Sequence, residues 1–268
     1  MKVAAIQMVS GVSLQANLDQ ARLLLAKAAQ GGAVLAVLPE YFCLMGQRDT
    51  DKLAVRERFG DGAVQRFLAD AARELGLWIV GGTLPLAAAD DDHVRNTNLV
   101  FSPAGQCVAR YDKIHLFKFD NGRERYDESR VIEAGREPAA FDLSAPDGQL
   151  WRIGLSVCYD LRFPELFRAL LADVLLVPSA FTHVTGQAHW ELLLRARAVE
   201  NLAYVIAPAQ GGVHENGRRT WGHSMIVDPW GTVLAQQAEG PGVVLAQLDA
   251  SRQAQLRAQL PALEHRVL

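Results

Sequence analysis

Features of several protein classes are missing from this sequence. No stretch approaches the ~20 apolar residues that a membrane-spanning helix needs, so we expect no membrane partner. Lysine and arginine together number 27 against 30 aspartates and glutamates and form no run, so we expect no nucleic-acid partner. The apolar N-terminal stretch, MKVAAIQMV, is too short for a secretion signal. We therefore expect a cytoplasmic protein.

Cysteine is scarce as well. The chain has three, Cys43, Cys107 and Cys158, and this odd number without C-x-x-C spacing argues against a disulfide framework or a zinc knuckle. We expect all of them to be reduced thiols. There is no phosphate-binding loop and no GxGxxG fingerprint, and the spacing of His183 and His189 is poor for metal ligation. The simplest interpretation is chemistry without a cofactor or a metal.

The composition that is present is typical of one large globular domain. Apolar residues make up 50% of the chain and charged residues 21%, which is ordinary for a protein with a substantial core. No linker-like segment, no repeat with a period of 20 to 50 residues and no low-complexity tract divides the sequence. We expect a single domain that covers residues 1–268.

Strand and helix patterns alternate along most of the chain. Continuous apolar runs predict strands buried on both faces, and apolar residues at intervals of three and four predict helices. Turn chemistry between residues 98–101 and 108–111 predicts a hairpin, and so do the turn signals at residues 215–217, 228–231 and 239–242. Other strands are expected at residues 2–9, 33–40, 77–86, 151–157, 173–180 and 203–209, and helices at residues 14–28, 64–75, 164–171, 187–201 and 251–259. The pattern predicts an α/β fold with two mixed sheets and helices outside them.

One stretch, residues 151–168, ends a buried strand at Cys158 and begins a helix at Pro164. Proline suits the first helical position because no N–H partner is lost there. Unpaired N–H groups and the positive end of a helix dipole at such an elbow favour the thiolate of Cys158. A lone cysteine in this position is nevertheless more often an inert core thiol, so other residues must decide its role.

Two further polar residues follow strand-like stretches. Glu40 and Lys113 stand where open α/β sheets usually build their sites, although each alone is equally compatible with a solvated strand end. Together with Cys158 they form a possible nucleophilic apparatus. The carboxylate would take the thiol proton, and the ammonium would stabilise the oxyanion of a tetrahedral adduct.

Residues 113–138 have no sustained periodicity and carry many charges. We expect this segment to run as a long loop over a surface or the mouth of a site. Glu128 could supply a second carboxylate from this loop. Spacing does not distinguish it from Glu124 or Glu133.

The sequence contains candidate residues for two other nucleophilic arrangements, a serine elbow and a cysteine–histidine pair. The residues from Gly154 to Cys158 nearly match the GxSxG elbow, but cysteine replaces the second glycine, and Ser156 would lie along the strand. A serine hydrolase is therefore not expected. A cysteine–histidine pair stays open. Its candidate histidines are His115, His183, His189 and His223.

Three blocks of this sequence resemble motifs of the nitrilase superfamily of carbon–nitrogen hydrolases. They read LPEYF around Glu40, YDKIHLF around Lys113 and SVCYDLRFPELFR around Cys158, in the order and separation of that family. The resemblance runs from Val3 to about Val267. It implies a four-layer αββα sandwich, in which two mixed sheets carry helices on their outer faces, and a homodimer formed through the helices.

The resemblance also implies roles for the site residues. Glu40 is expected to be the general base, Lys113 to stabilise the oxyanion and Cys158 to be the nucleophile. Glu128, in YDESR, matches the family's second glutamate, which helps to position the substrate and the hydrolytic water. The backbone N–H of Tyr159 is expected to assist Lys113. The implied reaction hydrolyses a small-molecule amide through a thioester on the cysteine and needs no cofactor.

A finer resemblance concerns the substrate. Residues 178–201, followed by GHSMIVDPWGTVLAQ and EGPG, are similar to the branch that contains the deaminated glutathione amidases, which release 2-oxoglutarate and cysteinylglycine. Arg162 is the candidate to bind a substrate carboxylate, with a structural salt bridge as the alternative. Phe181 and Thr185 are candidate pocket residues.

The sequence is also compatible with other functions. The nearest is an ω-amidase acting on small dicarboxylic monoamides such as 2-oxoglutaramate, with the same catalytic residues and a smaller pocket. A more distant one is a non-catalytic descendant that binds proteins, although protein binding would not require the complete set of catalytic residues. Residues 118–123 are more charged than the family's pattern, which leaves the mouth of the pocket undefined.

Overall fold

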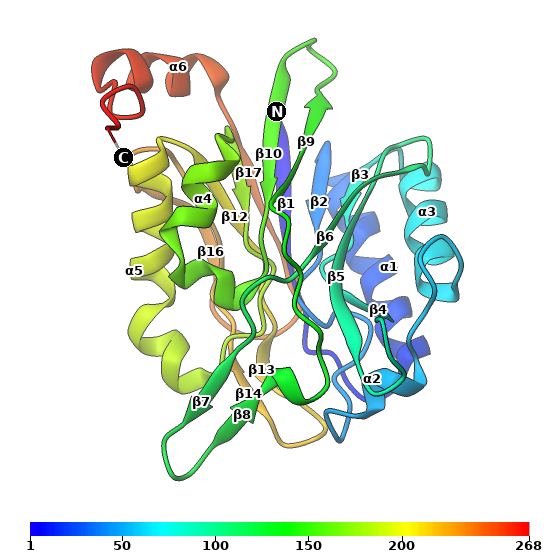
Figure 1. The fold of residues 1–268 in the computed structure, drawn as a ribbon. Coiled ribbons are helices and arrows are strands. Elements are labelled where there is room, and N and C mark those ends of the chain that lie inside the picture. The colour runs from blue at the N-terminus through cyan, green and yellow to red at the C-terminus, as the bar shows by residue number, and fades with distance from the viewer. Residues whose placement is uncertain (268) are drawn as a thin grey trace.

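Two mixed β-sheets face each other at the centre of the fold, and helices cover their outer faces (Figure 1). The structure is a computed structural model and describes residues 1–267. The first sheet contains, in spatial order, β17 (Gly242–Gln247), β1 (Lys2–Gln7), β2 (Leu35–Val37), β3 (Trp78–Val80), β5 (Val94–Phe101) and β4 (Leu84–Ala87), with β6 (Cys107–Asp112) paired to β5. The second contains β16 (Val233–Gln237), β15 (Ser224–Val227), β12 (Tyr204–Ala207), β11 (Val174–Leu176), β10 (Leu150–Leu155) and β9 (Ala139–Ser144).

The helices complete a four-layer sandwich. Helices α1 (Leu14–Gln30) and α3 (Ala63–Leu75) pack on the first sheet, and α4 (Pro164–Leu170) and α5 (His183–Asn201) pack on the second. The shorter helices are α2 (Asp51–Ala54), α6 (Ala250–Gln259) and the 3-10 helices η1 (Glu128–Arg130) and η2 (Cys158–Arg162). This order of layers confirms the predicted αββα sandwich. Within residues 1–267, no helix has both the length and the apolar character to cross a membrane.

Strand β1 shows why the central strands read as continuous apolar runs. Val3 and Ala5 belong to the core between the two sheets, whereas Ala4 and Ile6 belong to the core beneath α1 and α3. Successive side chains of a strand point to opposite faces, so a strand in the middle of four layers buries both of its faces. The same arrangement holds the ends of the neighbouring strands in fixed positions.

Helix ends follow local capping chemistry. Gly76 ends α3 in the left-handed conformation, with φ of 63°, where the sequence predicts the stop. Helix α5 begins at His183 rather than at the predicted residue 187. The hydroxyl of Thr182 caps it by accepting a hydrogen bond from the N–H of Thr185.

The predicted strand at residues 77–86 is two strands, β3 and β4, separated at Gly81 and Gly82. Gly82 adopts φ of 53°, and a Cβ atom there would lie 2.0 Å from the carbonyl oxygen of Pro39. Only glycine allows this approach. The close contact packs the β3–β4 turn against the residue that precedes Glu40.

Two of the three hairpins predicted in the last third are confirmed. They join β13 (Gly211–Val213) to β14 (Arg219–Trp221) and β15 to β16. The third was wrong, because residues 239–242 connect β16 of the second sheet to β17 of the first. The turn chemistry is the same, but the chain crosses between sheets there instead of folding back within one.

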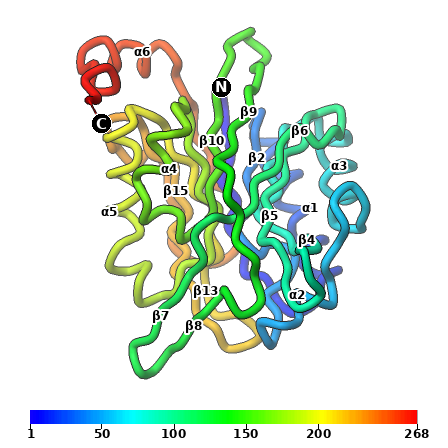
Figure 2. The backbone as a smooth tube through the Cα atoms, viewed as in Figure 1, coloured from blue at the N-terminus to red at the C-terminus, as the bar shows by residue number. Residues whose placement is uncertain are grey.

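The charged segment 113–138 contains a hairpin that its sequence does not predict. Strands β7 (Lys118–Asp120) and β8 (Arg125–Asp127) pair in it, and η1 follows. This hairpin projects from the end of the sandwich opposite α6 (Figure 2). The catalytic candidates lie near the base of the same segment.

Candidate active site

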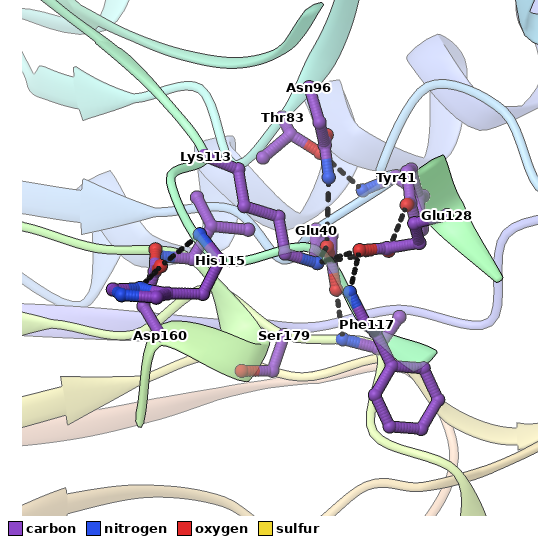
Figure 3. A network of polar contacts seen from close by, with 12 residues as sticks. Glu40, Tyr41, Thr83, Asn96, Lys113, His115, Phe117, Glu128, Asp160 and Ser179 are labelled. Atoms are coloured by element: carbon purple, nitrogen blue, oxygen red, sulfur yellow. Dashed lines mark hydrogen bonds and ion pairs between the residues drawn. The ribbon is translucent and has the colours of Figure 1, made fainter. Parts of the chain in front are cut away.

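Lys113 forms the centre of a buried ionic cluster (Figure 3). Its Nζ atom lies 2.9 Å from Oε1 of Glu40 and 2.8 Å from Oε2 of Glu128. The Lys113 and Glu40 side chains are 0% and 1% exposed. Glu40 follows β2, and Lys113 follows β6 directly, so the ends of two strands of one sheet bring these residues together.

Both oxygens of the Glu40 carboxylate accept hydrogen bonds. Oε1 accepts from Lys113 and from Nδ2 of Asn96, both at 2.9 Å. Oε2 accepts from the backbone N–H of Ala180 at 2.9 Å. A buried carboxylate with this many donors is held in one orientation, which a proton-transferring group requires.

Glu128 holds Lys113 from the other side. Its Oε1 accepts from the Tyr41 hydroxyl at 2.7 Å, and its Oε2 accepts from the Phe117 N–H at 2.7 Å. Burial opposes ionisation of Glu128, but the Lys113 ammonium outweighs it and holds the pKa of this carboxyl below its usual value. Glu128 is therefore an anion at neutral pH.

The structure distinguishes among the glutamates of the charged segment. Glu128 contacts Lys113, whereas Glu133 pairs with Arg95 and supports the return of the chain towards the sheet. Glu124 lies in the turn of the β7–β8 hairpin, where its carbonyl accepts from the N–H of Asn121. The second carboxylate of the cluster is thus Glu128.

Lys113 is a permanent cation. Burial alone would lower the pKa of its ammonium, but the Glu128 and Glu40 carboxylates raise it above the usual value. A cation that cannot lose its proton suits the stabilisation of a negative oxygen.

Cys158 stands at the end of β10 with a left-handed backbone. Its φ of 52° costs roughly 1–3 kcal/mol for a residue other than glycine, and the surrounding core must hold it there. Its N–H donates to the carbonyl of Pro178 at 2.9 Å, and its side chain belongs to the core between the sheets with 8% exposed. The elbow is therefore rigid.

The resting state of Cys158 is opposite to the predicted one. Burial raises the pKa of the thiol well above its usual value, and the Glu40 carboxylate raises it further, against the opposing effect of Lys113. The predicted helix dipole does not reach the thiol, because α4 begins only at Pro164 and a dipole acts over one turn. Burial and the Glu40 carboxylate thus favour the neutral thiol over the thiolate.

Sequence reasoning missed Asp160, which supports the elbow. Its buried carboxylate accepts from the N–H of Val157 at 2.8 Å, from the Tyr111 hydroxyl at 2.7 Å and from the N–H of His115 at 3.0 Å. These bonds tie the residue before Cys158 to the end of β6. The signal in the sequence was the position of this carboxylate, two residues after the cysteine and next to a buried strand.

The candidate histidines form other contacts. Nδ1 of His115 lies 2.7 Å from Oδ1 of Asp160. Nδ1 of His189 lies 3.2 Å from Nη2 of Arg162, and the rings of His183 and His223 pack against Trp221. Within the described residues, no hydrogen bond joins a histidine to Cys158. The structure gives no support to a cysteine–histidine pair.

Cys158 lines a small recess. The predicted substrate residues all line it, and so does the residue after the cysteine. These residues are Tyr159, Arg162, Phe181 and Thr185.

Arg162 lies at this recess with its guanidinium close to two aromatic rings. Its guanidinium carbon lies 5.7 Å from the ring centroid of Tyr159 and 5.8 Å from that of Phe181. No carboxylate between residues 1 and 267 lies within salt-bridge distance of it, so the structural salt bridge is not found. Arg162 is a cation without an anion, next to the thiol.

The other cysteines differ from Cys158. Cys43 is buried away from any cation, and burial raises the pKa of its thiol to about 12. Cys107 is exposed and free. Over the described part of the chain, no cluster of three or more histidine, cysteine, aspartate or glutamate side chains has the geometry to hold a metal ion.

A buried thiol beside a carboxylate and an ammonium, at strand ends of an αββα sandwich, defines a thiol-dependent hydrolase. The sequence model of the carbon-nitrogen hydrolase family matches residues 2–258. The chain belongs to this family and is a hydrolase that acts on amide carbon–nitrogen bonds.

Individual relatives agree with this assignment. A deaminated glutathione amidase from Synechocystis sp. is 42% identical over 98% of this chain and 97% of its own length. The crystal structure of a protein from Saccharomyces cerevisiae in branch 10 of the nitrilase superfamily superposes with a TM-score of 0.87, at 29% identity, over 100% of this chain and 97% of that one.

A third relative carries a covalent adduct. An amidase from Nesterenkonia sp. AN1, in which glutamine replaces a glutamate, has the acetamide moiety of fluoroacetamide bound to its active-site cysteine. It has a TM-score of 0.78 and 27% identity over 97% of this chain and 95% of that one. The active-site cysteine of that amidase thus forms a covalent bond to an amide compound.

Proposed function

We propose that this enzyme hydrolyses the amide bond of deaminated glutathione through a thioester on Cys158, releasing 2-oxoglutarate and cysteinylglycine. The observation that carries the proposal is the contact of Lys113 with the buried Glu40 and the partly buried Glu128, beside a thiol whose pKa is raised. The similarity to deaminated glutathione amidases supports the choice of substrate.

Acylation begins with proton transfer. Glu40 takes the thiol proton as Sγ of Cys158 attacks the amide carbon, which produces a tetrahedral oxyanion. Lys113 and the backbone N–H of Tyr159 stabilise this oxyanion. The carbon–nitrogen bond then breaks, and Glu40 gives its proton to the leaving amine of cysteinylglycine.

Deacylation uses the same groups. Glu40 takes a proton from a water molecule that attacks the thioester, and the tetrahedral adduct collapses to 2-oxoglutarate. The thiolate of Cys158 leaves and takes the proton back from Glu40. Glu128 positions the water and keeps Lys113 in place through the contacts that Tyr41 and Phe117 fix.

The acyl half of the substrate is placed at the recess beside Cys158. Arg162 binds the carboxylate of the 2-oxoglutarate unit, because its guanidinium is without an anion and a carboxylate can accept two of its N–H groups. Phe181 and Thr185 line the remaining wall.

The proposed substrate is tested by comparing turnover of deaminated glutathione with that of 2-oxoglutaramate. We expect kcat/KM to be at least about tenfold higher for deaminated glutathione, which corresponds to roughly 1.4 kcal/mol from contacts to the cysteinylglycine half. The measurement is the initial rate of 2-oxoglutarate release from each compound. Equal or reversed preference would favour an ω-amidase.

We further propose that residues 1–268 form one catalytic domain, that the enzyme works in the cytoplasm, and that it is a homodimer. The free cysteines support a reducing compartment. The outer face of α5 supports a dimer, because Leu192 and Val199 are 68% and 45% exposed on it.

The dimer is tested by light scattering. The wild type is expected to have twice the chain mass of 29.3 kDa, and Leu192→Glu is expected to be monomeric because it places a charge in an apolar contact. Leu23→Glu, a change at an exposed leucine of α1, is the matched control and should stay dimeric. A monomeric wild type at micromolar concentration would contradict the proposal.

A further inference from the structure

A second recess adjoins the one at Cys158, and Phe117 lies in the wall of both. Glu128 and Tyr41 connect the wall of this second recess to the ionic cluster through their hydrogen bond. Its outer walls come from α2, the β7–β8 hairpin and the turn before β14, which contribute Lys52, Tyr126 and Arg218.

The carboxylates in this wall already have cations. Asp49 lies 3.6 Å from Nζ of Lys52. Asp127 lies 3.4 Å from Nζ of Lys118, and Glu128 is held by Lys113. Each of these carboxylates therefore lies within salt-bridge distance of a lysine, and none lies within that distance of Arg218.

Arg218 is a half-buried cation without an anion. Its Nη2 donates to the carbonyl of Ala180 at 3.3 Å, its Nη1 lies 3.9 Å from Sδ of Met45, and its guanidinium lies 5.0 Å from the ring centroid of Tyr126. Its Nε is buried and has no hydrogen-bond partner among residues 1–267. A guanidinium with unused donors in a recess is a ready site for a carboxylate.

The backbone of Ala180 connects Arg218 to the reacting groups. Its N–H donates to Oε2 of Glu40, its carbonyl accepts from Arg218, and the residue lines the recess at Cys158. Arg218 is thus separated by one peptide residue from the carboxylate that would protonate the leaving amine. A group bound by Arg218 would belong to the half of the substrate that departs with this amine.

We propose that Arg218 binds the C-terminal carboxylate of the leaving amine half, cysteinylglycine, while Arg162 binds the carboxylate of the acyl half. This inference rests on the proposed function. Two unpaired guanidinium groups in adjoining recesses complement a substrate with a carboxylate at each end. Tyr126 of the β7–β8 hairpin supports the guanidinium, so this charged hairpin helps to select a dipeptide-like leaving group over ammonia.

The test compares Arg218→Met on two substrates. With deaminated glutathione, kcat/KM should fall about 10- to 100-fold, mainly through KM, because a charge-assisted contact is lost in both ground and transition states. With 2-oxoglutaramate, which has no second half, the loss should be at least about tenfold smaller. Arg219→Met is the matched control, since Arg219 is exposed and pairs with Glu239, and it should retain wild-type values on both substrates.

A second arm changes the substrate, and its wild-type comparison does not depend on the folding of a variant. The second substrate is deaminated glutathione with its glycine carboxylate converted to a carboxamide. The wild-type kcat/KM should be lower for this carboxamide than for the acid, by the same factor by which Arg218→Met lowers kcat/KM for the acid. Arg218→Met should not distinguish the acid from the carboxamide. Equal wild-type turnover of the two compounds would overturn the inference, and so would equal losses of Arg218→Met on both substrates.

Failure of this inference and failure of the proposed function give different results. A wild type that hydrolyses 2-oxoglutaramate but not deaminated glutathione overturns the proposed function and this inference with it. A wild type that hydrolyses deaminated glutathione at a rate that neither Arg218→Met nor the carboxamide changes overturns this inference alone.

Discussion

Cys158→Ala is expected to reduce amide hydrolysis by about 10⁴-fold or more, because the remaining residues cannot form a covalent intermediate. The fold should be retained, since alanine meets the same conformational cost as cysteine at φ of 52° and removes only one sulfur atom from the core. Initial rates with deaminated glutathione measure the loss, and thermal unfolding measures the fold.

The control for this variant is Cys107→Ser, a change to an exposed thiol away from the ionic cluster. It should retain wild-type activity. Full activity in Cys158→Ala, or equal losses in both variants, would show that the nucleophile lies elsewhere.

Lys113→Met is expected to remove both activity and stability. It leaves Glu40 and Glu128 facing each other in a buried site without their cation, and breaking such a pair costs about 3–5 kcal/mol. Activity should fall because the oxyanion loses its charged partner. Denaturant unfolding gives the change in stability, and initial rates of surviving folded protein give the change in activity.

A double variant separates these effects. Lys113→Met with Glu128→Gln removes one of the uncompensated charges, so it should regain part of the stability while its activity stays lost. Lys118→Met is the matched control, because Lys118 belongs to the same segment and is 76% exposed, and it should change stability by less than about 0.5 kcal/mol. Unchanged stability in Lys113→Met would contradict the description of the cluster.

The sequence predicts elements whose signals are local. Apolar residues at helical intervals followed by Gly76 define α3, and the predicted end is the observed one. The β7–β8 hairpin was missed because Lys118, Asp120 and Arg125 are exposed and show no apolar alternation. Residues 239–242 have the turn chemistry of a hairpin, and only the packing of two sheets decides that the chain crosses between them there.

The ionic cluster could be predicted in part, because polar residues after buried strands converge at one edge of the sandwich. The choice of Glu128 over Glu133 required the structure, because sequence spacing does not show which of the two side chains contacts Lys113. The thiolate preference inferred from the elbow was wrong, because burial and the Glu40 carboxylate raise the pKa of the Cys158 thiol. The expected transfer of the thiol proton to a carboxylate is compatible with this shift.

Two functional candidates, Asp160 and Arg218, were not identified from the sequence. Asp160 acts by satisfying buried N–H groups around the elbow, and that role depends on contacts with β6. Arg218 and Arg219 are adjacent in one turn, so the sequence does not show which of them faces the recess. The structure distinguishes them because Arg219 pairs with Glu239, whereas Arg218 forms no salt bridge within the described chain and its Nε has no hydrogen-bond partner there.

The thioester on Cys158 is the central claim, and rapid acid quench followed by peptide mass spectrometry tests it most directly. Deaminated glutathione is mixed with the wild type, and the reaction is quenched in acid within the first turnover. We expect a 2-oxoglutaryl adduct on the peptide that contains Cys158, removable by hydroxylamine and absent from Cys158→Ala. An adduct on Cys43 or Cys107, or hydrolysis that continues at the wild-type rate in Cys158→Ala, would contradict the account.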